Sequence, residues 1–223
     1  MYSVDSEKKK MFLKKLFQWH KKNYRKFSWR KEKDPFHIII AEIMLQKTDA
    51  KKVEAVYESF IEKYPNPKSL SNAKVKEIEK YFKKLGIRKR AKRLKNFSSD
   101  LISRYEGKVP DNRDELKSLI GIGDYISNAV LCFAYNKEVP LLDTNFIRVL
   151  DRIFSIRTLK SRARTDQNLW ITLTTMIPKG KGREFNLAIL DFAALICKSR
   201  NPDHDNCPQK NICDFYAYLS KKN

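Results

Sequence analysis

Two carboxylates occupy positions where a carboxylate can take part in chemistry. Asp143 follows an apolar stretch that ends at Leu142, and Glu42 interrupts the apolar run FHIIIAEIMLQKT at residues 36–48. A fixed anion such as Asp143 can stabilise positive charge that develops in a reaction and can position water. A carboxyl group buried among apolar side chains, as expected for Glu42, has a raised pKa and can donate a proton. Each also has a structural interpretation, because Asp143 can cap the following helix and Glu42 can pair with an arginine.

Three of the four cysteines lie close together near the C-terminus, at positions 197, 207 and 213, with His204 between them. In a reducing compartment such cysteines ligate metals more often than they form disulfides. Three thiolates and one imidazole describe a structural zinc site, and iron–sulfur clusters also bind thiolates and accept imidazole. The sequence therefore predicts a metal site formed by Cys197, His204, Cys207 and Cys213. Cys132 lies in an apolar segment and is expected in the core.

A glycine-rich turn joins two expected helices in the middle of the chain. The segment LIGIGDY at residues 119–125 follows a short helix and precedes an apolar helix that runs to about residue 134. Gly121 and Gly123 let the backbone adopt unusual dihedral angles around Ile122, and free N–H groups of the second helix can bind a phosphate. Such contacts position a nucleic acid without reading its sequence. A GxG turn is by itself also a common helix connection, so its neighbours must decide its meaning.

The elements around these residues are predicted to be helical. Glycine is scarce, with 6 residues, helix formers dominate, and the alternating patterns typical of strands are missing. The expected fold class is therefore all-α. The predicted helices cover residues 7–26, 36–48, 50–63, 73–84, 88–105, 112–119, 125–134, 143–153, 167–177 and 185–196.

The net charge is strongly positive. The chain carries 47 Lys and Arg against 26 Asp and Glu, a formal charge of +21, with a dense basic stretch at residues 83–95 that includes Arg88, Lys89 and Arg90. Such a field attracts polyanions. A nucleic acid is favoured over a membrane, because no apolar stretch reaches the roughly 20 residues of a spanning helix. A lysine-rich surface that serves only solubility is the alternative.

Together these features resemble the helix-hairpin-helix (HhH-GPD) DNA glycosylase superfamily, which includes endonuclease III, the adenine glycosylase acting opposite 8-oxoguanine and the archaeal mismatch thymine glycosylases. LIGIGDYISNAVLCFAYNKEVPLLDTNFIRVL resembles the family's hairpin, following helix and catalytic aspartate loop, and residues 197–213 stand where the family has its iron–sulfur loop. The resemblance implies a two-lobed all-α fold. One lobe would be a helical barrel at residues 28–137, and the other would combine residues 1–27 with 138–223, with DNA across the cleft.

The resemblance also implies an activity, monofunctional hydrolysis of an N-glycosidic bond in double-stranded DNA. Asp143 would support the positive charge at the sugar C1′, and Glu42 would face the base pocket. Gln46, four residues later on the same helix face, would fill the gap left by the flipped-out nucleotide. Tyr125 stands where bifunctional members have a Schiff-base lysine, so efficient AP-lyase activity is not expected. The residues expected to contact DNA are Gln46, Lys47, Arg88, Lys89, Arg90, Gly121, Ile122, Gly123, Lys198 and Arg200.

Tyr125 also bears on the substrate. The mismatch thymine glycosylases have tyrosine at this position and the adenine enzymes usually have serine, so the resemblance favours thymine or uracil opposite guanine. Excision of adenine opposite guanine or 8-oxoguanine, or of an oxidised pyrimidine, is the nearest alternative. A non-catalytic DNA-binding metalloprotein is a third interpretation. The protein is expected to be a monomer. Because the N-terminus lacks a signal-peptide pattern, we expect it inside the cell, in the cytoplasm or nucleoid.

The chain departs from the family pattern at three positions. The cluster spacing is Cys, six residues, Cys, two residues, Cys, five residues, Cys, and His204 replaces the second cysteine. A [4Fe–4S] cluster is the expected cofactor, with zinc or no metal as alternatives. Ile120 replaces the usual hairpin proline. Asp124 replaces a residue that is commonly basic and is expected to turn inward as a helix cap, because its carboxylate would repel a phosphate.

Overall fold

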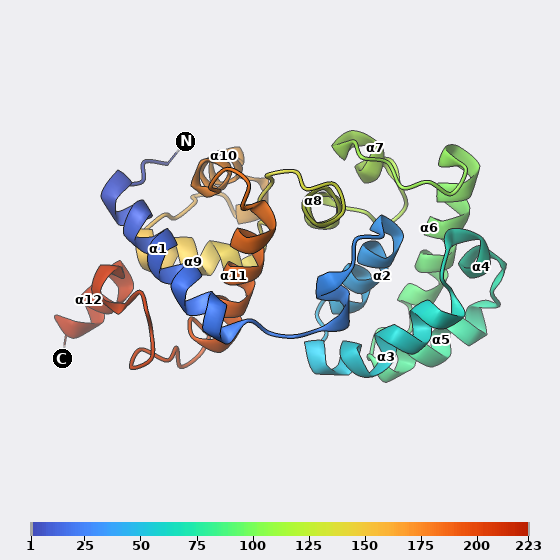
Figure 1. The fold of residues 1–223 in the computed structure, drawn as a ribbon, viewed down its shortest axis with the longest axis horizontal. Coiled ribbons are helices and arrows are strands. Elements are labelled where there is room, and N and C mark those ends of the chain that lie inside the picture. Colours follow the sequence, from blue (N-terminus) through green and yellow to red (C-terminus); the bar gives the residue numbers. More distant parts are fainter. Residues whose placement is uncertain (1, 223) are drawn as a thin grey trace. The chain divides into compact units, whose positions relative to one another are not determined.

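The fold is that of a computed structural model describing residues 2–222 (Figure 1). Within these residues the chain forms twelve α-helices and three short 3-10 helices and contains no strand, which confirms the all-α prediction. It divides into two compact units. Unit 1 comprises the residues up to Arg25 and those from Glu138 onward, and unit 2 comprises Lys26–Lys137. No helix in the described part is long and apolar enough to cross a membrane.

Unit 2 is built around α2, which is buried on most sides because its sequence is almost entirely apolar. Helix α2 packs against α3 and α8, α4 and α5 pack against α6, and α7 packs against α8. Aromatic rings fill the core, where Phe36 stacks on Phe97 and Phe60 meets Phe82 edge-on. The elements of unit 2 are η1 (Ser28–Lys31), α2 (Pro35–Leu45), α3 (Ala50–Lys63), α4 (Pro67–Asn72), α5 (Val75–Lys84), α6 (Arg90–Tyr105), α7 (Arg113–Ser118) and α8 (Asp124–Phe133).

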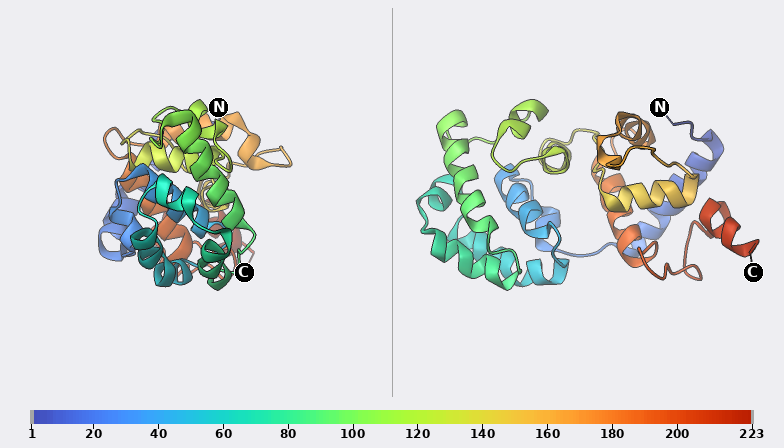
Figure 2. Two further views of the ribbon diagram at one scale, coloured as in Figure 1. Left: turned by 90° about the vertical axis from the view of Figure 1, so that its right-hand side faces the viewer. Right: turned by 180° about the vertical axis from the view of Figure 1, so that it is seen from behind.

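Unit 1 places two helices against α11, which runs through its core. Helices α1 and α9 both pack on α11, and α12 packs on α9, as the three views show (Figures 1 and 2). Phe12, Phe146, Phe185 and Phe192 are fully buried between these helices. The elements of unit 1 are α1 (Ser6–Asn23), α9 (Thr144–Phe154), η2 (Ala163–Thr165), α10 (Gln167–Met176), α11 (Gly182–Leu195), η3 (Lys210–Ile212) and α12 (Asp214–Ser220).

A buried polar pair joins the N-terminal helix to the rest of unit 1. His20 Nε2 lies 3.0 Å from Asp191 Oδ2, and the Arg25 backbone N–H donates to the same oxygen at 3.1 Å. The side chains of His20 and Asp191 are 7% and 0% exposed. A buried carboxylate is tolerated only when its oxygens are hydrogen-bonded, so these donors fix α1 and the following residues to α11.

Three helix predictions need correction. The helix predicted to reach Thr48 ends at Leu45, and a short helix α4 precedes α5 where a connection was expected. A capping box accounts for α4, since Asn66 and Ser69 exchange hydrogen bonds and Pro67 starts the first turn. The chain also continues as helix α12 beyond the cysteine-rich loop.

Candidate functional site

Asp143 is held rigidly at the start of α9. Its Oδ1 accepts backbone hydrogen bonds from Asn145 at 2.8 Å and Phe146 at 2.9 Å, so it is the N-cap of the helix. Its other oxygen, Oδ2, accepts from Asn145 Nδ2 at 2.6 Å. The structural interpretation of Asp143 as a cap is therefore confirmed. It is compatible with a chemical role, because a cap fixes the carboxylate in one orientation.

Arg148 extends this arrangement by one helical turn. Its NH2 group donates to Asn145 Oδ1 at 3.0 Å and to the Ala193 carbonyl at 3.0 Å, and its Nε donates to the Cys197 carbonyl at 2.7 Å. Asn145 thus bridges the carboxylate of Asp143 and the guanidinium of Arg148. The three side chains form one hydrogen-bonded series from α9 to the backbone of the cysteine-rich segment, so the orientation of Asp143 depends on both partners.

The environment raises the pKa of Asp143 above its usual range. Burial is the largest cause, because it disfavours the charged form. The hydrogen bonds from Phe146 and Asn145 and the charge of Arg148 oppose it. A carboxylate that keeps its charge in a partly buried place can stabilise a nearby cation more strongly than a solvated one can, because water screens it less.

Glu42 and Tyr125 both lie in unit 2. Glu42 is 6% exposed on α2, as expected for a carboxylate inside an apolar helix. Tyr125 is the second residue of α8 and is half-buried. Helices α2 and α8 pack against each other, so these two candidate residues belong to neighbouring elements.

The glycine-rich turn has the predicted helix-hairpin-helix form, which consists of α7, residues 119–123 and α8. Asn112 caps α7, and Gly121 adopts a positive φ of 85° that favours glycine. The Ile122 side chain is buried and its N–H donates to the Leu119 carbonyl at 3.2 Å. The side chain and the N–H of Ile122 are therefore both engaged within the turn. Gly123, in contrast, is the exposed N-cap of α8.

The two unusual hairpin residues have structural explanations. The Ile120 N–H donates to Asp100 Oδ2 at 3.1 Å, a hydrogen bond that proline cannot make. Asp124 does not cap a helix, so that expectation was wrong. Its Oδ1 lies 2.7 Å from both Arg113 NH2 and Lys117 Nζ, and it joins the start of α8 to α7. Asp124 therefore neutralises two cations of α7 instead of acting as the expected cap.

Helix α2 ends at Leu45, so its helical spacing does not continue beyond Gln46. Gln46 lies beyond the end of α2 as its C-cap, and Lys47 follows with a positive φ of 58°. Arg90 caps this end of the helix, because its NH1 donates to the carbonyls of Ile43 at 3.0 Å and Gln46 at 2.7 Å. Burial, together with the charge of Arg93, lowers the pKa of Arg90. The C-terminal carbonyls of α2 thus find a partner from α6.

The other predicted DNA contacts differ in how far their charge is already used. Arg88 is exposed but forms two contacts with Glu79 Oε2, at 2.8 Å and 2.9 Å. Lys89 lies exposed beside it at the start of α6. Lys198 and Arg200 are exposed side chains of unit 1. Lys89, Lys198 and Arg200 therefore present their side chains to solvent.

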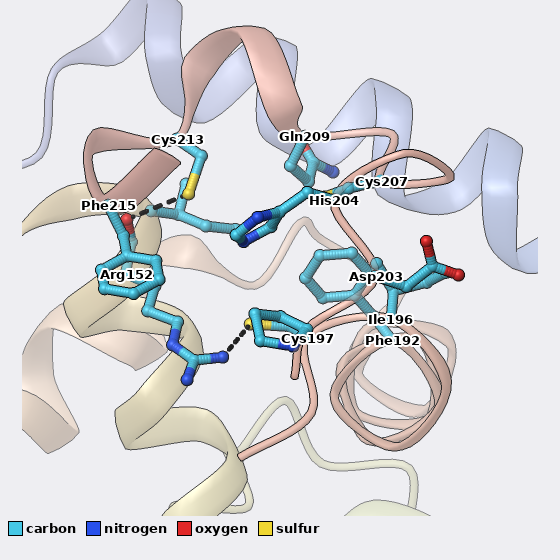
Figure 3. A pocket seen from close by; sticks show the side chains of 12 residues that line it. Arg152, Phe192, Ile196, Cys197, Asp203, His204, Cys207, Gln209, Cys213 and Phe215 are labelled. Carbon is cyan, nitrogen blue, oxygen red and sulfur yellow. Dashed lines mark hydrogen bonds between the residues drawn. The ribbon is translucent and has the colours of Figure 1, made fainter. Parts of the chain in front are cut away.

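The cysteine loop, residues 197–213, brings the four predicted ligands around one cavity. Cys197, His204, Cys207 and Cys213 line it together with Arg152 and Phe215 (Figure 3). The cysteines of the described chain are all free thiols. Burial raises the pKa of the Cys207 thiol to about 11 and also raises that of Cys213. Thiolates persist in such a place only beside a cationic centre.

The donor set fits a group held by three sulfurs and one imidazole, although the side chains lie close around the cavity. Its volume is about 20 Å³, which is enough space for roughly one water molecule. Within residues 2–222 no three His, Cys, Asp or Glu side chains converge on one point that could hold a metal ion. A larger group would require these side chains to spread outward around it.

The match to a known family covers most of this architecture. Residues 40–173 match the HhH-GPD superfamily of base excision DNA repair proteins. The matched segment contains Glu42, the hairpin and Asp143 and extends over more than half of the chain. The chain belongs to the HhH-GPD superfamily.

Archaeal relatives within the HhH-GPD superfamily align over nearly the whole chain. A thymine/uracil-DNA glycosylase from Pyrobaculum aerophilum is 39% identical over 206 residues, which are 90% of each chain. A thymine-DNA glycosylase from Aeropyrum pernix is 37% identical and covers 97% of this chain and 99% of its own length. An adenine DNA glycosylase from Mycobacterium tuberculosis is 30% identical, and the match spans 64% of its length.

Solved structures agree with this membership. A thermostable thymine-DNA glycosylase has a TM-score of 0.89 at 34% identity and covers 95% of this chain and 98% of its own. An endonuclease III–DNA covalent intermediate has a TM-score of 0.84 at 23% identity, which supports the shared fold. The predicted resemblance to the HhH-GPD glycosylases is confirmed.

Three residues near the HhH-GPD aspartate were missed by the sequence analysis. Asn145 and Arg148 orient Asp143, and Arg152, one further turn along α9, lies against the cysteine loop. Their spacing carries a signal, since residues 148 and 152 are four apart and share a helix face. Their partners are mostly backbone carbonyls, which no side-chain pattern reveals.

Proposed function

We propose that this HhH-GPD protein is a monofunctional DNA N-glycosylase that removes thymine or uracil mispaired with guanine. The observation that supports the proposal most directly is the extent of the alignment with the archaeal glycosylases. Relatives named for thymine, or for thymine and uracil, match at 34–39% identity over 90–99% of this chain and 90–100% of their own lengths. The adenine glycosylases match over only 60–66% of their lengths.

In the proposed reaction the bond between the base and sugar C1′ breaks, and its electron pair leaves with the base. Asp143, fixed by three hydrogen bonds, stabilises the positive charge at C1′ and orients the attacking water. Water adds its oxygen to C1′, and its proton is released. The departing base takes up a proton, and Glu42, buried on α2, would supply a hydrogen bond or proton to it.

Tyr125 is the reason that we do not expect the enzyme to cleave the DNA strand. A lysine amine at the start of α8 could attack C1′ and form a Schiff base, which leads to elimination at the sugar. The phenol of Tyr125 carries no amine, so it cannot form this intermediate. The enzyme would release the base and leave an abasic site without efficient AP-lyase activity.

DNA would contact several of the predicted residues through different groups. The backbone of Gly121 and Gly123 and the N-terminus of α8 offer N–H groups to a phosphate, with Ile122 supporting the turn. Lys89, Lys198 and Arg200 offer exposed charge, while Arg88 would have to exchange its partner Glu79. Gln46 and Lys47 lie in the turn after α2, and Arg90 acts on this turn by capping the helix.

We also propose that Cys197, His204, Cys207 and Cys213 hold a [4Fe–4S] cluster, with zinc as the alternative that shares this donor set. When bound, such a group would tie the cysteine loop into one rigid element next to α9. No chemical step of base removal passes through it. Iron, sulfide and zinc analysis of protein purified without oxygen distinguishes the two.

The proposed activity is tested with duplexes that carry T:G, U:G, A:8-oxoguanine or thymine glycol. Release of thymine and uracil is expected, with strand breaks that appear only after hot alkali. The variant Asp143→Asn should bind DNA but release base more slowly by a factor of at least about 100, because a fixed catalytic anion is lost. Release of adenine alone would contradict the proposal that the substrates are thymine and uracil opposite guanine. Equal activity of the wild type and the variant would contradict the catalytic role of Asp143.

A further inference from the structure

Arg152 on α9 makes contacts with both ends of the cysteine loop. Its NH1 group lies 3.6 Å from Cys197 Sγ and donates to the Lys198 carbonyl at 2.6 Å. Its NH2 group donates to the Ser199 carbonyl at 3.1 Å. At the other end of the loop, the Cys213 thiol donates to the backbone carbonyl of Arg152 at 3.2 Å. One residue thus touches the first and the last proposed ligand.

The guanidinium of Arg152 is fixed in position. It lies over the ring of Phe215 at 5.0 Å, beside Cys197 (Figure 3), and it also donates to the carbonyls of Lys198 and Ser199. Holding a long side chain in one rotamer costs conformational entropy, and these contacts together offset that cost. The cation is therefore kept next to the sulfur of Cys197 and not simply exposed at the surface.

The effect of this contact depends on the state of the sulfur. A thiol sulfur is a weak acceptor, whereas a thiolate bound to iron carries negative charge and accepts a stronger, charge-assisted hydrogen bond. Donors to the sulfurs and positive charge near a cluster favour its reduced form, because reduction adds an electron to the group. The same contact that positions the loop would therefore raise the reduction potential of the cluster.

We propose that Arg152 is a positioning residue for the cysteine loop and that its hydrogen bond to Cys197 sets the reduction potential of the bound cluster. This inference rests on the proposed [4Fe–4S] cofactor. It assigns Arg152 an electronic effect on the cluster in addition to its packing. The proposed effect on the cluster does not involve Asp143. The partners of Arg152 named above all belong to the cysteine loop or to the start of α12, and they are Cys197, Lys198, Ser199, Cys213 and Phe215.

Two substitutions separate the electronic role from simple packing. Arg152→Met removes the charge and all donors, and Arg152→Lys keeps the charge but loses the planar fork. Arg157→Met is the matched control, because Arg157 lies just after the same helix and its substitution removes the same charge, but Arg157 pairs with Asp151 and not with the cysteine loop. All proteins are purified without oxygen, and iron, sulfide, melting temperature and the cluster's reduction potential are measured together with base release.

The potential of Arg152→Met should be more negative than that of the wild type, with Arg152→Lys shifted less in the same direction and Arg157→Met unchanged. If Arg152→Met does not retain iron, Arg152→Lys decides the comparison. Wild-type potential in both Arg152 variants, or an equal shift in Arg157→Met, overturns the role of Arg152. A wild type without iron overturns the cofactor as well, while its base release independently tests the proposed glycosylase activity.

Discussion

Asn145 gives the sharpest test of how the chain controls Asp143. Its side-chain amide donates to Asp143 Oδ2 at 2.6 Å, and Asn145→Ala removes this donor while the backbone cap of the helix remains. A hydrogen bond to a charged group contributes about 1.5–3 kcal/mol. Because about 1.4 kcal/mol corresponds to a factor of ten, the ratio of neutral to ionised Asp143 at a given pH should rise about 10- to 100-fold.

The expected direction follows from the pKa of Asp143, which burial already raises and Asn145 partly lowers again. The proposed reaction needs the ionised carboxylate, so activity should be lost as the pH falls through the raised pKa. Asn145→Ala removes a group that lowers this pKa, and the acid limb of the rate profile should move to higher pH. In single-turnover assays on the duplex from which the wild type releases base fastest, the rate of base release by Asn145→Ala should recover in part at alkaline pH.

A matched control exists in α10. Asn168 has the same position after its N-cap Asp166, to which its backbone N–H donates at 3.0 Å, as Asn145 has after Asp143. Asn168 is exposed, and Asn168→Ala repeats the substitution at the start of another helix, so it should leave the pH profile unchanged. An acid limb of Asn145→Ala that coincides with that of the wild type would refute the reasoning. A uniform rate loss at every pH would show that Asn145 acts only through geometry.

The remaining predictions concern stability and DNA affinity. Gly121→Ala should lower the free energy of unfolding by roughly 1–2 kcal/mol in urea titrations, because φ is positive and the new Cβ would lie 2.8 Å from Arg93 Nε. Gly123→Ala has open space and should cost less. Asp191→Ala should cost about 3 kcal/mol or more by leaving buried partners uncompensated, whereas Glu184→Ala, which breaks an exposed pair, should cost about 1 kcal/mol or less. Lys89→Ala should reduce the salt slope of DNA binding by about 0.9 and Arg88→Ala by less, since Glu79 already pairs with Arg88. Equal slopes for the two variants would contradict this difference.

Local signals in the sequence predicted most helix starts correctly. Asn112 and Asp143 cap the helices that follow them, and the glycines at 121 and 123 form the expected turn. These features depend on residues within a few positions of each other. Short-range hydrogen bonds and backbone preferences are enough to specify them.

The end of α2 could not be predicted in the same way. The run of apolar residues contains no glycine or proline before Thr48, and the helix stops at Leu45. The carbonyls it leaves are bonded by Arg90, which follows Ile43 by 47 positions. A tertiary contact thus satisfies the end of the helix, and no local pattern of residues predicts such a contact.

The two arginines of α9 that position Asp143 and the cysteine loop escaped prediction for a related reason. Arg148 and Arg152 donate to carbonyls of residues 193 and 197–199, which lie more than 40 positions later. Any residue offers a backbone carbonyl, so the sequence of the acceptor carries no information. Only the spacing of the two arginines on one face of α9 pointed to a common purpose.

The net charge of +21 suggests more positive charge for binding DNA near the hairpin than the structure leaves there, because several cations already have partners. Arg113 and Lys117 both pair with Asp124, Arg88 pairs with Glu79, and Arg90 bonds the end of α2. Arg113 and Lys117 hold α7 against α8 and so fix the geometry of the turn, whereas Arg90 closes the end of α2. A phosphate at the hairpin would then be bound mainly by backbone N–H groups at the start of α8, whose orientation Asp124 secures at the cost of local positive potential.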